Sequence, residues 1–314
     1  MKLLRWIVSA VCLTLLAYLA RRVNWHVTVI TASRASLAPL VAAMLVNGVS
    51  LTLRGARWWI FLRQVGASSL PLAIRGAIVG AGLNNVLVAN GGDAARVLLV
   101  ARTTGVSRSI VLATMALERI FDPVCFGLLL FVATFVTPLP ARLAAARGVV
   151  GAALLLAGAL LVLLARTPAS SWQADSPHGW RGHVREFRCR VQSLASAKRI
   201  GAALASSVGV WPLQITEFAL IAHSLRLGLP IGGSIAAMLL INTGLVVRAT
   251  PGNVGYFQFA YAVAVSRFGV GADAAVAAAV LIQAIEIVPV TIAALVLAPG
   301  MINRRHQRIY VTIA

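Results

Sequence analysis

Three charged side chains lie inside one apolar stretch of the chain, residues 108–136. They are Glu118, Arg119 and Asp122, and most of their neighbours are apolar. If the stretch is helical, Glu118 and Asp122 share a face, and Arg119 can pair with Asp122 three positions on. Each charge near the centre of a bilayer costs about 2.5–3.5 kcal/mol on the insertion scale, so the helix must turn these groups away from lipid. The pattern predicts a polar cavity for a charged headgroup or a coupling ion. The alternative is an ion-pair network that only holds helices together.

Two other apolar stretches are interrupted by glycine, asparagine and proline. The breaks are Gly91-Gly92-Asp93 in residues 70–105 and Pro251-Gly252-Asn253-Val254-Gly255 in residues 228–270. Irregular backbone at membrane depth is tolerated only where it is buried in protein or lines a cavity. We therefore predict two re-entrant hairpins, each with a short second helix whose N-terminal N–H groups suit an anion such as phosphate. The alternative is that these glycines form tight turns that bind nothing.

The candidate site residues fall into three groups. The candidates for contact with an anionic headgroup are Arg96, Arg119 and Arg248. The candidates for balancing those charges or carrying protons are Asp93, Glu118, Asp122 and Glu286. The hairpin tips are Gly91, Gly92, Pro251, Gly252, Asn253 and Gly255. We predict no catalytic residue, cofactor or metal, because the sequence has no nucleotide-binding loop, no nucleophile motif and no spacing typical of metal ligands.

The composition limits the class of protein that could position these residues. Hydrophobic residues make up 60% of the 314 residues and charged residues only 11%. A soluble domain has about 25% charged residues, so soluble, disordered and disulfide-rich secreted proteins are excluded. The formal net charge is +20. In an apolar chain, we interpret this charge as basic loops on the cytoplasmic side of a membrane rather than as a nucleic-acid surface.

The expected fold is all-α, a polytopic integral membrane protein with six full crossings and two re-entrant hairpins. A crossing helix needs about 20 apolar residues. The six candidates are 3–20, 36–53, 108–136, 147–165, 200–222 and 274–298. This arrangement puts both termini in the cytoplasm, with most basic residues on that side, as the positive-inside rule requires. Arg54, Arg57 and Arg63 are then expected in the cytoplasmic loop after the second crossing.

The hairpins divide the chain into an inverted repeat. Asp122 follows Gly105 by 17 positions, and Glu286 follows Gly269 by 17 positions. Two units of opposite orientation with matching breaks are typical of transporters that bind substrate near the midplane. Chance coincidence of these residues is the alternative. The predicted parts are an anchor helix (1–35), a first repeat (36–136), a connecting helix with a basic loop (137–199), a second repeat (200–298) and a cytoplasmic tail (299–314).

Several of these residues also carry a family resemblance. The motifs are Asn84-Asn85-Val86-Leu87, Gly92-Asp93, Arg96, Gly105-Val106-Ser107, Glu118-Arg119-x-x-Asp122, Arg54-Gly55-Ala56-Arg57-Trp58 and Pro251-Gly252-Asn253-Val254-Gly255. In this order they resemble the lysylphosphatidylglycerol synthase transmembrane-region family, also called flippase-like. The resemblance implies a bacterial or archaeal inner-membrane protein that moves or binds lipids. The chain departs from the family pattern at Val88, Asn90 and Gln258. Because we expect no synthase domain, the aminoacyl-transfer activity of two-domain members does not carry over.

We therefore expect a lipid translocase of the bacterial inner membrane that is not an enzyme. Its expected partners are a phospholipid or other anionic lipid, the membrane itself, and either a second copy of the chain or a separately encoded lipid-modifying enzyme. The main alternative is a non-transporting membrane protein that presents lipid to such an enzyme. An intramembrane enzyme using Glu118 and Asp122 is disfavoured, because neither a serine or histidine motif nor a metal motif accompanies them.

Overall fold

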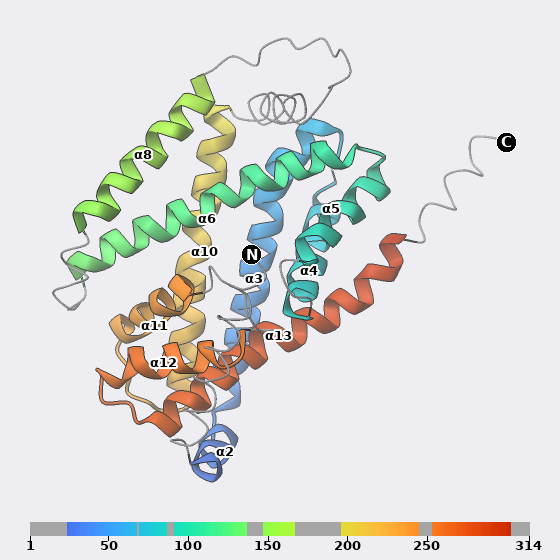
Figure 1. Ribbon diagram of the computed structural model, residues 1–314. Coiled ribbons are helices and arrows are strands. Elements are labelled where there is room, and N and C mark those ends of the chain that lie inside the picture. The colour runs from blue at the N-terminus through green and yellow to red at the C-terminus, as the bar shows by residue number, and fades with distance from the viewer. Residues whose placement is uncertain are drawn as a thin grey trace, which may run out of the picture. The chain divides into compact units, whose positions relative to one another are not determined.

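A computed structural model describes residues 24–67, 69–86, 91–136, 147–166, 196–244 and 253–302. Within these ranges the regular elements are all helices, which confirms the predicted all-α class (Figure 1). The helices are α2 (Trp25–Ser33), α3 (Leu37–Leu62), η1 (Arg63–Val65), α4 (Leu70–Val86), α5 (Gly91–Thr104), α6 (Arg108–Val136), α8 (Arg147–Arg166), α10 (Ala197–Ser224), α11 (Ile231–Gly244), α12 (Tyr256–Ser266) and α13 (Ala272–Ile302).

In the part of the chain that the structure describes, three segments are long and apolar enough to cross a membrane. They are Leu37–Val65, Lys198–Ser224 and Ala272–Leu297, and they coincide with three of the predicted crossings. Two further predicted crossings correspond to α6 and α8, with 29 and 20 residues. The predicted crossing at 3–20 lies outside the described residues. The count of six crossings therefore stays a prediction.

The second crossing is longer than predicted. We expected it to end near residue 53, but α3 continues to Leu62. The helix continues because Trp58, Phe61 and Leu62 are fully buried and hold the extra turns against the core. The expectation that Arg57 lies in a cytoplasmic loop is therefore wrong, because Arg57 belongs to this buried part of the helix.

Both predicted hairpin segments are pairs of short helices. α4 and α5 have 17 and 14 residues, and α11 and α12 have 14 and 11. At 1.5 Å per residue, even the longest spans about 26 Å, less than the roughly 30 Å of a hydrocarbon core. After each pair comes a glycine with positive φ, Gly105 at 77° and Gly269 at 80°. These local similarities agree with a repeat, while a re-entrant path through a bilayer stays a prediction.

The chain forms two compact units. Unit 1 contains residues 1–51, 78–95 and 212–296, and unit 2 contains residues 52–77, 96–211 and 297–314. Each predicted repeat contributes segments to both units, and the division of the chain into two repeats stays a prediction.

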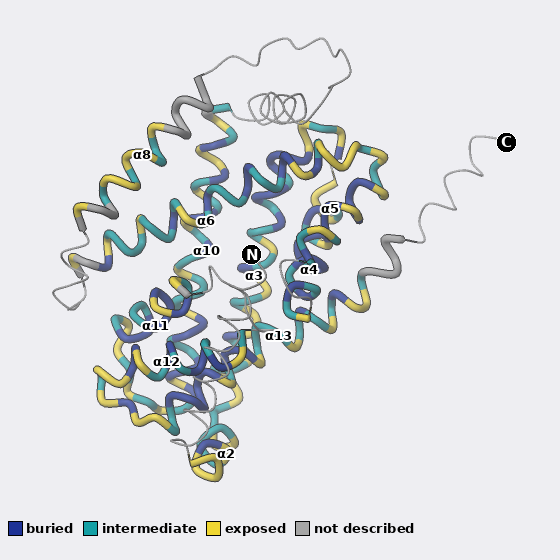
Figure 2. The backbone as a smooth tube through the Cα atoms, in the orientation of Figure 1, coloured by how far each residue is buried: buried dark blue, intermediate teal, exposed yellow. Residues whose placement is uncertain are grey.

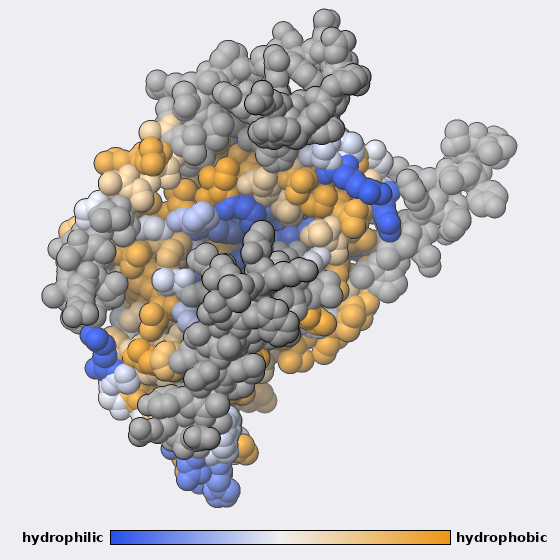
Figure 3. All heavy atoms as spheres, viewed as in Figure 1, coloured by the Kyte–Doolittle hydropathy of each residue, from blue (hydrophilic) through white to orange (hydrophobic). Residues whose placement is uncertain are grey.

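Much of the surface is apolar. Leu155 and Leu156 on α8 are 78% and 73% exposed, and exposed positions recur along this helix (Figure 2). The space-filling view shows hydrophobic residues over most of the described part of the visible face (Figure 3). Soluble monomers rarely expose apolar patches larger than a few hundred Å². The exposed side chains are those that suit contact with lipid.

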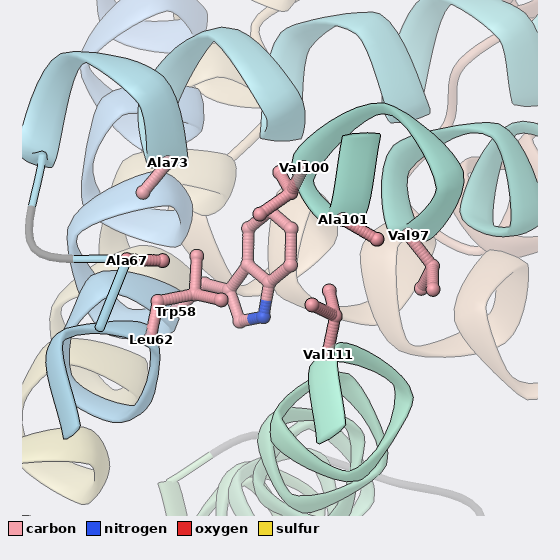
Figure 4. Packing of buried hydrophobic residues seen from close by; sticks show 8 residues of the cluster. All are labelled: Trp58, Leu62, Ala67, Ala73, Val97, Val100, Ala101 and Val111. Carbon is pink, nitrogen blue, oxygen red and sulfur yellow. The ribbon is translucent and has the colours of Figure 1, made fainter. Parts of the chain in front are cut away.

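The core of unit 2 is built around Trp58 on α3. The indole packs among Leu62, Ala67, Ala73, Val97, Val100, Ala101 and Val111 (Figure 4). Gly76 on α4 lets α4 approach α3 closely, because a Cβ there would lie 2.9 Å from the Trp58 ring. A second cluster stacks Phe61 against Phe121 on α6, with ring centroids 6.0 Å apart. These contacts fix α3 against α5 and α6.

Unit 1 has a separate aromatic core. Phe218 on α10 contacts Phe257 and Tyr261 on α12, with centroid distances of 6.2 and 6.1 Å. α11 packs on α12. Gly82 on α4 lies so close to α13 that a Cβ there would overlap the side chain of Ala294. Small residues at such crossings are typical of packed membrane helices.

A buried charge cluster as the candidate functional site

Arg57 forms the centre of a charge cluster in unit 2. Its Nη1 donates to Oδ1 of Asp122 at 2.8 Å and to Oγ of Ser207 at 2.7 Å. Its Nη2 donates to Oε1 of Glu118 at 3.0 Å. Both carboxylates can reach one guanidinium because residues four apart on α6 share a face. The arginine therefore joins α3, α6 and α10, and its side chain is only 1% exposed.

Glu118 links Arg57 to a second arginine. Its Oε2 accepts a hydrogen bond from Nη2 of Arg96 on α5 at 2.8 Å. The Arg96 guanidinium also lies over the Trp58 ring, 3.6 Å from the centroid. The indole Nε1 of Trp58 donates to Oγ1 of Thr114 at 3.0 Å. One carboxylate oxygen and an aromatic face together hold the desolvated Arg96 guanidinium in a fixed orientation.

The cluster becomes more exposed toward one edge. Glu118 is 3% exposed, whereas the side chains of Asp122 and Arg119 are 29% and 40% exposed. Arg119 lies near Asp122, with Nη1 and Oδ2 separated by 3.8 Å. Arg54 also acts electrostatically on Asp122. The ion pairs thus run in an unbroken sequence from the buried Arg96 to the half-exposed Arg119.

Several guanidinium groups share the two carboxylates of the cluster. Those of Arg57, Arg96 and Arg119 are joined by ion pairs to Glu118 and Asp122. Buried ion pairs are at best weak contributors to stability, because desolvation offsets their attraction. Guanidinium groups gathered in an apolar environment are also groups that bind anions such as phosphate.

Four of the predicted site residues come together here, and the others lie elsewhere. The four are Arg96, Glu118, Arg119 and Asp122. Asp93 and Glu286 belong to unit 1. Gly91 and Gly92 begin α5, and Asn253 and Gly255 immediately precede α12. Arg248, Pro251 and Gly252 lie outside the described residues.

Arg57 and Ser207 were missed as site residues. The apolar run Trp58-Trp59-Ile60-Phe61-Leu62 after Arg57 could have shown that the helix continues and carries the arginine inward. Ser207 has no comparable signal, because several serines occur along the same helix. Its contact with Arg57 joins residues 150 positions apart.

At the first hairpin tip, an amide side chain closes the break between α4 and α5. The backbone N–H of Gly92 donates to Oδ1 of Asn84 at 2.9 Å, and Nδ2 of Asn84 donates to Oδ1 of Asp93 at 3.1 Å. A Cβ at position 92 would overlap the carbonyl oxygen of Gly80, so glycine is needed for this close approach. The Gly92 N–H, one of the groups predicted to bind an anion, therefore already has an acceptor within the chain.

The second tip is closed in a similar way by glutamine. The N–H of Gly255 donates to Oε1 of Gln258 at 2.8 Å, and the Gln258 amide donates to Oε1 of Gln283 on α13. Gln258 is the position where the resembled family often has glutamate. The neutral amide serves here as a helix cap and as a link to α13. Anion binding at either tip stays a prediction.

These observations define the class of protein. Long apolar helices, an apolar surface and charges gathered inside unit 2 are the properties of an integral membrane protein. The chain belongs to the lysylphosphatidylglycerol synthase transmembrane-region family, whose model matches residues 3–294. This match confirms the resemblance drawn from the motifs. Comparison with curated proteins gave no match.

Proposed function

We propose that this protein is a lipid translocase that binds the anionic headgroup of a lipid in the polar interior of unit 2. The observation that carries the proposal is the charge cluster around Arg57, which gathers the guanidinium groups of Arg57, Arg96 and Arg119 among apolar helices. The phosphate of a lipid headgroup is an anion that guanidinium groups bind through charge-assisted hydrogen bonds. Membership of a membrane family named after a phospholipid-modifying enzyme supports lipid as the substrate class.

A hydrogen-bond donor in the cluster supports the same proposal. The Nε of Arg57 is buried and has no hydrogen-bond partner within the described part of the chain. A buried donor of this kind usually has a partner, commonly a water or a ligand. An oxygen of a bound phosphate would supply one. Both carboxylates already bond to guanidinium groups, which supports a binding role rather than acid–base catalysis.

In the proposed mechanism, a phosphate and the carboxylates compete for the same guanidinium groups. The headgroup first meets Arg119 and Asp122, whose side chains are the most exposed of the cluster. It then replaces a carboxylate at Arg57 or Arg96. The displaced Asp122 or Glu118 can take up a proton, which would couple lipid movement to proton movement. Each exchange keeps the total charge of the membrane interior small, which lowers the barrier to crossing.

A proteoliposome assay tests the proposal. The full chain is reconstituted with fluorescent anionic phospholipids, and movement between leaflets is followed by chemical quenching from outside. We expect Arg119→Ala and Asp122→Asn to slow movement at least about tenfold, because each removes a charge-assisted contact. Arg108→Ala, an exposed arginine at the start of the same helix, is the matched control. Equal transport by both site variants and the control would refute the assignment of the site.

The near-complete burial of Arg57 and Glu118 favours a second candidate function. A closed ion-pair network can simply fix helices in a membrane protein that presents lipid to a separately encoded enzyme. Under this alternative, the purified chain moves no lipid by itself. It would instead co-purify with an enzyme in a fixed ratio, which affinity purification from the native membrane measures.

A further inference from the structure

A groove lies between α6 and α8 within unit 2. Its volume is about 590 Å³, and its lining is apolar apart from Arg119. The α6 side is lined by Ala116, Arg119, Ile120, Pro123, Val124, Gly127 and Leu130, and the α8 side by Ala153, Leu154 and Ala157. The two helices pack closely beside it, since a Cβ at Gly127 would lie 3.1 Å from Leu154. Alanine, glycine and proline leave the space that larger side chains would fill.

The α6 side of the groove beyond Arg119 is about as long as an acyl chain. From Arg119 to Leu130 there are 11 residues, which span about 16 Å along a helix. The hydrocarbon core of a bilayer is about 30 Å thick and holds two leaflets, so one acyl chain extends about 15 Å. Ligand pockets for small molecules have volumes of about 300–1,000 Å³, and this groove falls within that range.

The position of Arg119 indicates the chemistry of the ligand's second end, the one that does not lie among the apolar side chains. Arg119 is the charged residue of the lining, and it lies near the N-terminal end of the α6 side. Its guanidinium is permanently charged and has N–H donors in a planar arrangement that suits a phosphate. A ligand that lies along the apolar part and ends in an anion therefore matches both chemistries of the groove.

We propose that the α6–α8 groove binds one acyl chain of an anionic diacyl phospholipid, with the lipid phosphate at Arg119. The next groups along the ion-pair sequence are Asp122 and Arg57. As a lipid path into the charge cluster, this inference rests on the proposed function; as a binding site, it can be tested without transport.

The test measures lipid that stays bound to the purified full chain. Native mass spectrometry in mild detergent counts the retained phospholipids. Phosphatidylglycerol with a diazirine in one acyl chain then maps their position by cross-linking. We expect one retained phospholipid per chain and cross-links within residues 119–130 and 153–157.

Two variants alter the groove, and each has a matched control. Ala153→Phe fills the groove, whereas Ala152→Phe adds the same ring to a neighbouring exposed alanine outside the lining. Arg119→Gln removes the charge, whereas Arg108→Gln does so at an exposed position outside the groove. Loss of one charge-assisted contact weakens binding about tenfold or more. We expect Ala153→Phe and Arg119→Gln to lose lipid by at least that factor and both controls to retain it.

Three results would overturn the inference. The first is equal retention by Ala153→Phe and Ala152→Phe. The second is retention of a fatty acid instead of a phospholipid, with no effect of Arg119→Gln. The third is a dimer that Ala153→Phe dissociates, which would make a second copy of the chain the occupant. A wild-type chain that retains lipid at the groove but moves none would support this site and refute the proposed function.

Discussion

The carboxylate of Glu118 lies 3.0 Å from the guanidinium of Arg57, and both side chains are almost completely buried. A charge placed alone in an apolar interior is strongly disfavoured, so each of these groups depends on the other. The pair joins α3 to α6 at the level of the aromatic core. It also sets the electrostatic state of the proposed headgroup site. Stability and ligand binding therefore depend on the same contact.

Replacement of Arg57 by alanine should be severely destabilising. The change removes the guanidinium that bridges Glu118 and Asp122. Loss of one member of a buried ion pair costs about 3–5 kcal/mol. Thermal unfolding in detergent, followed by circular dichroism, measures the effect. Arg63→Ala, at an exposed arginine stacked over Trp59, should cost under about 1 kcal/mol. Equal losses in both variants would contradict the central role of Arg57.

Glu118 should matter more for stability than Asp122. Glu118→Gln removes the charge that separates two buried arginines, whereas Asp122 is 29% exposed and pairs with one buried arginine, Arg57. We expect Glu118→Gln to cost about 1–3 kcal/mol more than Asp122→Asn, the difference typical of a buried charged hydrogen bond. Unfolding in denaturant compares the two variants directly. The opposite ranking would place the centre of the network at Asp122.

Gly92→Ala should disrupt the first hairpin tip. The added methyl group would overlap the Gly80 carbonyl and press against Asn84, so α5 must move away from α4. The Gly92–Asn84 hydrogen bond is then lost, and limited proteolysis should cut near the tip at a higher rate. Gly48→Ala is the control, because a Cβ there meets nothing within 4 Å and alanine favours a helix by about 1 kcal/mol. Equal cleavage of the two variants would count against the close approach of Gly92 to the Gly80 carbonyl.

Gln258 should tolerate glutamate better than leucine. A glutamate keeps the oxygen that accepts the Gly255 N–H, and the Gln283 amide can turn to donate to it. Leucine removes that acceptor from a buried position, which costs about 1–3 kcal/mol. We therefore expect a lower melting temperature for Gln258→Leu than for Gln258→Glu. If Gln258→Glu were the less stable variant, the neutrality of Gln258 would matter more for stability than its hydrogen bond to Gly255.

The sequence by itself determined the class of protein and several residues of the charge cluster. The apolar fraction indicated a membrane protein, and the glycine-containing breaks indicated two pairs of short helices. Charges inside the apolar stretch 108–136 identified Glu118, Arg119 and Asp122. The membrane class was predictable because the energetic cost of charge and of broken helix in lipid depends largely on local composition. The roles of these charges as a binding site stay predictions.

The tertiary structure decided which groups those charges meet. Arg57, assigned by sequence to a loop, proved to be the centre of the cluster, and Ser207 bonds to it from 150 positions away. The shallow groove beside Arg119 likewise depends on how α8 packs against α6. Helical periodicity fixes the face on which a side chain lies, but only packing between distant helices fixes its partner.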